Sequence, residues 1–225
     1  MGPRYGISVA DRELACAPIS SPEGKAYYAA MRCAINMSFA NRQMILHRIR
    51  EVFAFIFGKT AEELGIRQIY DIAHNTAKFE EQEIGGKKVK LLVHRKGATR
   101  AYGPGLAELP SVYRSLGQPV IIGGSMETGS YLLVGTATAS QAFFSTAHGA
   151  GRTMSRTKAK NIFHGRQLQD QMRQRGIYVR SVSYAGLAEE AGAAYKNVDE
   201  VAASAEAAGL SRRVARFEPI GNIKG

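Results

Sequence analysis

The sequence contains no tryptophan and only two cysteines in 225 residues, and it has no long apolar run. A membrane-spanning helix needs roughly 18 consecutive apolar residues, and no stretch reaches that length. Cys16 and Cys33 are too few for a disulfide framework or a cysteine zinc site, so we expect each to be a buried free thiol. The first residues, Met-Gly-Pro-Arg-Tyr, do not have the pattern of a secretory signal peptide. We therefore expect a cytoplasmic protein without a membrane segment.

Acidic residues are also scarce, with 19 Asp and Glu against 30 Lys and Arg, which gives a net charge of +11. Arginine supplies 19 of the 30 basic residues, and its planar fork of donors suits phosphate groups. The charge is uneven: residues 151–180 hold eight basic residues and one acid, whereas residues 181–210 hold five acids and one lysine. A local basic segment is typical of a surface that binds a polyanion. A solvated helix face explains the same pattern equally well.

The length fits one domain over residues 1–225. A capping pair, Ser20 and Glu23, predicts the start of a long helix that ends near Phe57, before Gly58. We expect its apolar side chains to form part of the core. These side chains are Tyr27, Met31, Phe39, Ile45, Ile49 and Phe53.

Further elements alternate irregularly along the chain. Two strand-like runs, 67–75 and 87–97, flank a turn at Gly85 and Gly86, and the patterns predict further strands at 119–125, 130–136 and 177–183. A basic helix is expected over 153–175, and a second helix over 197–209 with Asn197 as its cap. This mixture favours an α+β fold of sheets with flanking helices over a doubly wound sheet.

Two glycine-bearing turns are candidates for binding an anion, namely Gly123–Ser130 and His148–Arg152. Glycine lets backbone N–H groups approach phosphate oxygens closely. If the basic helix starts near Thr153, its free N–H groups add to the second turn, and Arg152 and Arg156 share one face. An ordinary glycine-rich turn is the alternative in each case. The phosphate loop and the dinucleotide-binding fingerprint of the common nucleotide folds are both missing.

Among the five histidines, His148 has the smallest neighbours, which leave its ring open to a bulky substrate. Such an imidazole can be a general base, a metal ligand or a nucleophile that forms a phosphoramidate. His74 and His94 lie near predicted strand ends, where either a ligand role or simple hydrogen bonding is expected. His47 and His164 are interpreted as structural or surface residues.

The order and wording of these motifs resemble one family, the RtcB RNA ligases, or 3'-phosphate tRNA-splicing ligases. The resemblance is to their C-terminal half and runs from about Tyr5 to Gly225, nearly the whole chain. The strings that carry it are "DRELACAPISSPEG", "AMRCAINMSFANRQ", "YDIAHNTAKFE", "VHRKGATRAYGPG", "PVIIGGSMETGSYLLVG", "STAHGAGRTMSR", "YKNVDEV" and "PIGNIKG".

The resemblance implies a ligase that joins an RNA 3'-phosphate or 2',3'-cyclic phosphate end to a 5'-hydroxyl end, with GTP and manganese as cofactors. By matching motif, His148 would be the catalytic residue that becomes guanylylated. His74 would be a manganese ligand. The residues implied around the nucleotide are His74, Asn75, Gly123, Gly124, Ser125, Met126, Ser130, His148, Gly149, Ala150, Gly151, Tyr195 and Lys224. The candidates for contacts with phosphate or RNA are Arg95, Lys96, Arg152 and Arg156.

The chain also departs from the family pattern. Ala147 stands where the family has cysteine, and Gly123, Glu127 and Gly129 replace residues of the nucleotide loop. Glu127 is expected to add negative charge beside the phosphate pocket unless it points to solvent. The family's N-terminal half, which supplies most manganese ligands, has no counterpart in this sequence.

Two hypotheses follow from the missing half. In the first, the chain is an RNA ligase completed by an N-terminal half in cis or in trans, with archease as a further possible partner. In the second, it is a non-catalytic RNA- or nucleotide-binding module, a relic of the ligase.

Overall fold

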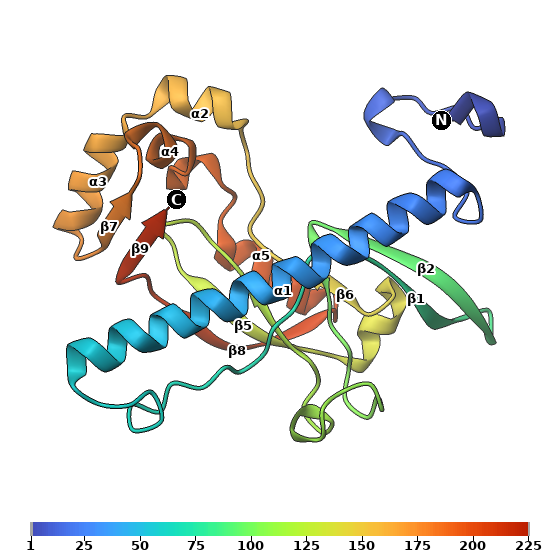
Figure 1. The fold of residues 1–225 in the computed structure, drawn as a ribbon, viewed down its shortest axis with the longest axis horizontal. Coiled ribbons are helices and arrows are strands. Elements are labelled where there is room, and N and C mark those ends of the chain that lie inside the picture. Colours follow the sequence, from blue (N-terminus) through green and yellow to red (C-terminus); the bar gives the residue numbers. More distant parts are fainter. Residues whose placement is uncertain (1, 225) are drawn as a thin grey trace. The chain divides into compact units, whose positions relative to one another are not determined.

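The computed structural model describes residues 2–224 (Figure 1). Contacts between residues divide the chain into two compact units, Met1–Lys78 and Phe79–Gly225. Helices and several small sheets are mixed along the chain, which confirms the predicted α+β class. The prediction of one domain over the whole chain stays a prediction.

The first unit is dominated by one long helix, α1 (Pro22–Phe57), preceded by the short 3-10 turns η1 (Gly2–Tyr5) and η2 (Arg12–Leu14). The cap of α1 is Ser21, whose Oγ accepts a hydrogen bond from the N–H of Gly24 at 3.1 Å. The predicted pair of Ser20 with Glu23 is therefore wrong by one residue, because Glu23 instead accepts hydrogen bonds from Arg4 and Tyr5. The predicted end is confirmed: Gly58 adopts the left-handed conformation, at φ 61°.

The apolar side chains of α1 are mostly exposed, so the prediction that they form a core is wrong. Only Gly24 is buried among the helix residues. The physical reason is that apolar residues surround the helix near its C-terminal end instead of forming one stripe, so a single packed face cannot cover them. The exposed apolar side chains are Tyr27, Met37, Met44, Ile45, Ile49, Val52, Phe53, Phe55, Ile56 and Phe57.

The two cysteines are free, as predicted, but both are exposed, whereas burial was expected. Cys33 lies on α1 and shares the helix's lack of cover. Over residues 2–224, no helix combines the length and the apolar composition that crossing a membrane would require.

A β-hairpin joins β1 (Asn75–Ile84) to β2 (Lys87–Lys96), with Gly85 and Gly86 in the turn at φ 57° and 76°. Two positive φ values in a two-residue turn match the twist of the strands. The run 67–75 was predicted as the first strand, but the strand begins only at Asn75. β1 was missed because its sequence is polar and its inward residues include the charged Glu80.

The main sheet of the second unit is antiparallel and has the order β4 (Pro119–Ile122), β5 (Ser130–Gly135), β8 (Ser211–Phe217), with a bulge at Leu132/Leu133. Helix α5 (Val198–Ala207) contacts β8, and Asn197 caps it as predicted. A short pair, β3 (Ala98–Arg100) with β6 (Ser145–Ala147), ends directly before His148. The remaining 3-10 turns are η3 (Ser111–Tyr113), η4 (Ala137–Ala142) and η5 (Gly192–Ala194).

Beside this sheet, three helices gather around a parallel pair of strands, β7 (Tyr178–Ser181) and β9 (Gly221–Lys224) (Figure 1). The helices are α2 (Arg156–Ile162), α3 (Gly165–Gln174) and α4 (Tyr184–Glu189). The basic helix predicted over 153–175 is therefore two helices. It starts only at Arg156, with Ser155 as its cap, and extended backbone at Phe163 interrupts it. Arg152 precedes the helix, so the predicted shared helix face with Arg156 is wrong.

One buried ion pair links the hairpin to the β3–β6 region. The guanidinium of Arg95 donates to both carboxylate oxygens of Glu80, at 2.7 and 2.8 Å, to the Ser145 hydroxyl and to the carbonyl of Phe143. The Arg95 side chain is only 3% exposed. The predicted contact of Arg95 with RNA is therefore corrected to a structural role, because a phosphate could reach this guanidinium only after the Glu80 pair opens.

The substitution Glu80→Gln should lower the free energy of unfolding by about 3–5 kcal/mol, because it leaves the buried Arg95 charge without its counter-ion. Urea unfolding followed by circular dichroism measures this loss. The control is Glu206→Gln, which weakens a solvent-exposed pair with Arg213 and should leave the unfolding midpoint nearly unchanged. Equal effects of the two substitutions would contradict a structural role for the Arg95–Glu80 pair.

The assignment of the α1 cap has its own test. Ser21→Ala should destabilise the first turn of α1 by about 1 kcal/mol, because the N–H of Gly24 loses its acceptor. Amide hydrogen exchange of Gly24 and its neighbours should become faster. Ser20→Ala is the matched control and should have no such effect; faster exchange in that variant would restore the cap predicted from sequence.

Candidate functional site

The two glycine-bearing turns lie side by side, joined by backbone hydrogen bonds. The N–H of Gly123 donates to the carbonyl of His148 at 3.2 Å, and the N–H of Ala150 donates to the carbonyl of Gly123 at 2.8 Å. Gly123 and Gly149 thus form an isolated parallel bridge at the ends of β4 and β6. The pairing sets the half-buried His148 beside the Gly123–Ser130 loop.

Hydroxyl groups organise the interior of this loop. Ser130 Oγ accepts from the N–H of Gly124 at 3.4 Å, and Thr128 Oγ1 accepts from the N–H of Ser125 at 2.8 Å. Backbone N–H groups were expected to point together at a phosphate. Two of them, those of Gly124 and Ser125, instead donate to hydroxyl groups of the loop. A hydroxyl that accepts in this way keeps its own proton to donate. Gly124 is required here, since a Cβ would lie 2.1 Å from the carbonyl oxygen of Gly129.

The underside of the loop is anchored in the protein. Met126 is 2% exposed and belongs to a core cluster that includes Met172 and Leu187, so only its backbone is open to a nucleotide. Its carbonyl accepts a hydrogen bond from Asn222 Nδ2 on β9 at 3.0 Å. The C-terminal strand therefore holds the loop from below.

Glu127 does not point to solvent, nor does its carboxylate stand free beside the loop. It accepts a hydrogen bond from the N–H of Gly192 at 2.9 Å. A Cβ at Gly192 would lie 2.0 Å from that carboxylate, so the close approach requires glycine. Glu127, which departs from the family pattern, thus joins the loop to η5.

A second group of predicted residues meets at Glu190. Its carboxylate accepts a hydrogen bond from the Tyr195 hydroxyl and forms ion pairs with Arg152, at 3.4 Å, and Lys224, at 3.7 Å. Arg152 also donates to Tyr195 Oη at 2.8 Å and lies over its ring, 4.7 Å from the centroid. Burial, followed by the hydrogen bond to Glu190, raises the pKa of Tyr195. The C-terminal strand β9 therefore brings Lys224 to the carboxylate that also binds Tyr195.

The neighbouring Glu189 binds the basic side chains of α2. Lys160 Nζ lies 2.6 Å from its carboxylate, and Arg156 Nε lies 3.8 Å away. The hydrogen bond from Lys160 lowers the pKa of Glu189. Sequence reasoning missed both glutamates, although the contrast between the basic segment 151–180 and the acidic segment 181–210 was the available signal. These two segments partly neutralise each other.

His74 and Asn75 belong to the first unit and are both exposed, directly before and at the start of β1. Lys96 is exposed at the end of β2. The manganese role of His74 stays a prediction. Within the described residues, no group of three or more His, Cys, Asp or Glu side chains is arranged to hold a metal ion.

A cavity of about 730 Å³ adjoins the second group of residues, and its lining includes Ala147, Thr153, Tyr195 and Glu200. Its volume is within the range of roughly 300–1,000 Å³ that small-ligand sites occupy. His148, Ser125 and Lys224 do not line it. Apart from His74 and Asn75 of the first unit, the predicted nucleotide residues therefore divide into the two turns at His148 and a cluster at Glu190.

Comparison with known proteins gives one consistent result. The family model described as "tRNA-splicing ligase RtcB" matches residues 1–225. The tRNA-splicing ligase RtcB of Archaeoglobus fulgidus is 52% identical over 99% of this chain, which covers 46% of that protein. The proteins of the same name from Pyrococcus furiosus and Methanocaldococcus jannaschii are 51% and 52% identical over 99% and 98% of the chain, which covers 23% of each.

The chain thus spans about half, or less, of the length of these relatives. The matched residues nevertheless include the two glycine-bearing turns, Gly123–Ser130 and His148–Arg152. They also include the cluster at Glu190 and the hairpin that follows His74. The chain belongs to the RtcB family of tRNA-splicing ligases.

Proposed function

We propose that this chain is the C-terminal part of a GTP- and manganese-dependent RNA ligase that joins 3'-phosphate or 2',3'-cyclic phosphate ends to 5'-hydroxyl ends. The observation that carries the proposal is the backbone pairing of Gly123 with Gly149. It sets a histidine with small neighbours beside a hydroxyl-rich loop, as transfer of a nucleotidyl group requires.

In the proposed reaction, a ring nitrogen of His148 forms a P–N bond with the α-phosphorus of GTP, and pyrophosphate leaves. The RNA 3'-phosphate then takes the GMP group from the histidine, so the P–N bond breaks. Finally, the 5'-hydroxyl attacks the activated phosphate, loses its proton and releases GMP. Each step moves negative charge onto phosphoryl oxygens, which positioned donors stabilise.

The residues of this chain would act as those donors. The Ser130 hydroxyl accepts from the N–H of Gly124 and keeps its proton for a phosphate oxygen. The hydroxyls of Ser125 and Thr128 share one hydrogen bond, so one of the two also keeps its proton. Arg156 is more available than Arg95 or Arg152, since its side chain is 70% exposed and its ion pairs are long. Arg152 instead positions Tyr195 and Glu190.

Manganese fits this chain poorly by itself. A divalent ion in a protein needs several ligands, and the described residues contain no suitable cluster. We therefore derive no step through the metal, and propose that most of its ligands come from the remaining part of the ligase.

That remaining part also accounts for the exposed apolar residues of α1. Large apolar side chains that are exposed along one helix in this number favour an interaction site. The chain covers only 46% of the Archaeoglobus fulgidus relative, so a comparable length of protein is left to cover the helix. We propose that it packs on α1, in the same chain or as a separate one. A role for archease and a cytoplasmic location stay predictions.

His148 should become labelled when the chain is incubated with manganese, GTP radiolabelled in the α-phosphate and the part of the Archaeoglobus fulgidus relative that this chain does not match. The label should be acid-labile and base-stable, as expected of a phosphoramidate. His148→Ala should abolish it, and His164→Ala, a change at an exposed histidine, should not. No label from a mixture shown to associate would exclude the catalytic proposal and favour a non-catalytic binding module.

The substitution Phe55→Asp should weaken association with that added part by at least tenfold. Phe55 is 89% exposed, so the change removes apolar contact surface with little effect on the isolated chain. Analytical ultracentrifugation of the mixture measures the association. Asn41→Asp adds the same charge to α1 without removing apolar surface and should change little; equal weakening by both variants would place the interface elsewhere.

A further inference from the structure

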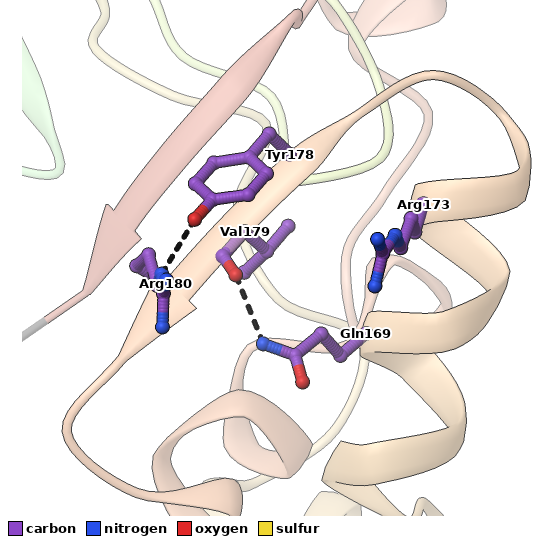
Figure 2. Close-up of a pocket in the computed structure, with 5 residues that line it drawn as sticks. All are labelled: Gln169, Arg173, Tyr178, Val179 and Arg180. Carbon is purple, nitrogen blue, oxygen red and sulfur yellow. Dashed lines mark hydrogen bonds between the residues drawn. The ribbon is translucent and has the colours of Figure 1, made fainter.

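A separate pocket of about 260 Å³ lies between α3 and β7, away from the residues assigned above. Gln169 and Arg173 line it from the helix, and Tyr178, Val179 and Arg180 line it from the strand (Figure 2). The volume is slightly below the range of roughly 300–1,000 Å³ for small-ligand pockets, so it suits one unit of a longer ligand.

The floor of the pocket is fixed by the edge of β7. The N–H of Tyr178 donates to the carbonyl of Ile220, directly before β9, and the N–H of Val182 donates to the carbonyl of Lys224 in β9. The carbonyl of Val179 therefore points to the opposite edge of β7. Gln169 Nε2 donates to that carbonyl at 2.9 Å (Figure 2). The edge is thereby closed to strand addition at this position, and the pocket keeps its shape.

The ring of Tyr178 is uncovered. It is 56% exposed, and its partner in the parallel register is Gly221, which has no side chain to cover it. Arg180 Nε donates to the Tyr178 hydroxyl at 2.6 Å, and its guanidinium carbon lies 5.6 Å from the ring centroid. The guanidinium therefore lies over the ring near its hydroxyl, and the exposed remainder of the ring is left for stacking.

Two positive charges in the pocket are without a carboxylate partner within residues 2–224. Among the described residues, no carboxylate forms a salt bridge with Arg173 or Arg180, whereas Arg152, Arg156 and Lys160 are all paired with glutamates. Arginine forks next to an aromatic face are the groups that bind a phosphate and a stacked base of single-stranded nucleic acid.

The pocket is connected to the loop beside His148 through the end of α3. Arg173 lines the pocket, and two residues later Arg175 donates to the carbonyl of Glu127 in the loop at 3.0 Å. We infer that the α3–β7 pocket binds one nucleotide of a single-stranded RNA, its base stacked on Tyr178 and its phosphate held by Arg173 and Arg180. This inference rests on the proposed function in taking RNA as the polyanion.

A protein partner fits the pocket less well. The exposed apolar side chains nearby, Ile220 and Ile223, do not line the pocket. Most of the side chains that line it are charged or polar. The lining favours an anion with an aromatic group over an apolar surface.

The test measures binding of a short fluorescein-labelled single-stranded RNA to the whole chain by anisotropy, over a range of salt concentrations. Tyr178→Leu should weaken binding roughly five- to a hundredfold, because stacking is lost, and Tyr178→Phe should restore it. Arg173→Gln and Arg180→Gln should each weaken binding and reduce the salt slope by about one. Circular dichroism confirms that each variant is folded.

Matched controls come from the same region. Arg166→Gln removes an exposed arginine of α3 outside the pocket, and Tyr184→Leu removes a tyrosine that is 53% exposed; both should bind RNA nearly as tightly as the wild type. Equal weakening by controls and pocket variants would overturn the inference, as would unchanged binding in all of them or equal competition by polyglutamate. Labelling of His148 is measured separately, so a failed pocket leaves the proposed ligase chemistry intact, and absent labelling leaves the binding result readable.

Discussion

The site depends on two backbone hydrogen bonds, from Gly123 to His148 and from Ala150 to Gly123. They join the end of β4 to the end of β6, two short elements that are far apart in sequence. Both hydrogen bonds join main-chain groups, so the pairing does not depend on which side chains stand at these positions. Neither glycine is required by the pairing itself: a Cβ at Gly149 would lie at ordinary contact distance, 3.4 Å, from the carbonyl oxygen of Gly123, and a Cβ at Gly123 would meet no atom within 4 Å. The pairing thus fixes the half-buried His148 beside the Gly123–Ser130 loop through main-chain groups alone.

Much of the fold could be predicted from local patterns. The end of α1 at Gly58, the glycine turn of the hairpin, strands β4, β5 and β7, and the Asn197 cap of α5 follow from turn and cap chemistry that acts over a few residues. The errors arose where tertiary contacts outweigh local patterns. β1 was missed because its inward charge, Glu80, is stabilised by Arg95, fifteen residues away. The prediction that α1 forms part of the core was wrong, because the spacing of apolar residues indicates an apolar surface but not whether other residues pack on it.

The candidate site was less accessible to sequence reasoning than the fold. Its residues were named by resemblance, and the structure supplies the contacts that organise them. Glu190 is the clearest example: no local pattern distinguishes it, yet Tyr195, Arg152 and Lys224 all meet at its carboxylate. Glu127 is the opposite case. From the sequence alone, the charge of Glu127 was expected to oppose phosphate binding. In the structure, its carboxylate accepts a hydrogen bond from the N–H of Gly192 and helps to hold the loop in place.

The net charge of +11 therefore says little about which cations can meet a phosphate. Arg95 is buried and its guanidinium is hydrogen-bonded to Glu80 and to neighbouring oxygen atoms. Removing the Glu80 carboxylate would leave a buried positive charge without a counter-ion, which lowers the stability of the fold. Arg156 is exposed with partners at 3.8 and 4.0 Å, and such pairs contribute so little that a phosphate can replace them. Arg173 and Arg180 have no carboxylate to lose within residues 2–224. Availability to an anion thus increases from Arg95 through Arg156 to the arginines of the α3–β7 pocket, an order set by burial and ion pairing and not by composition.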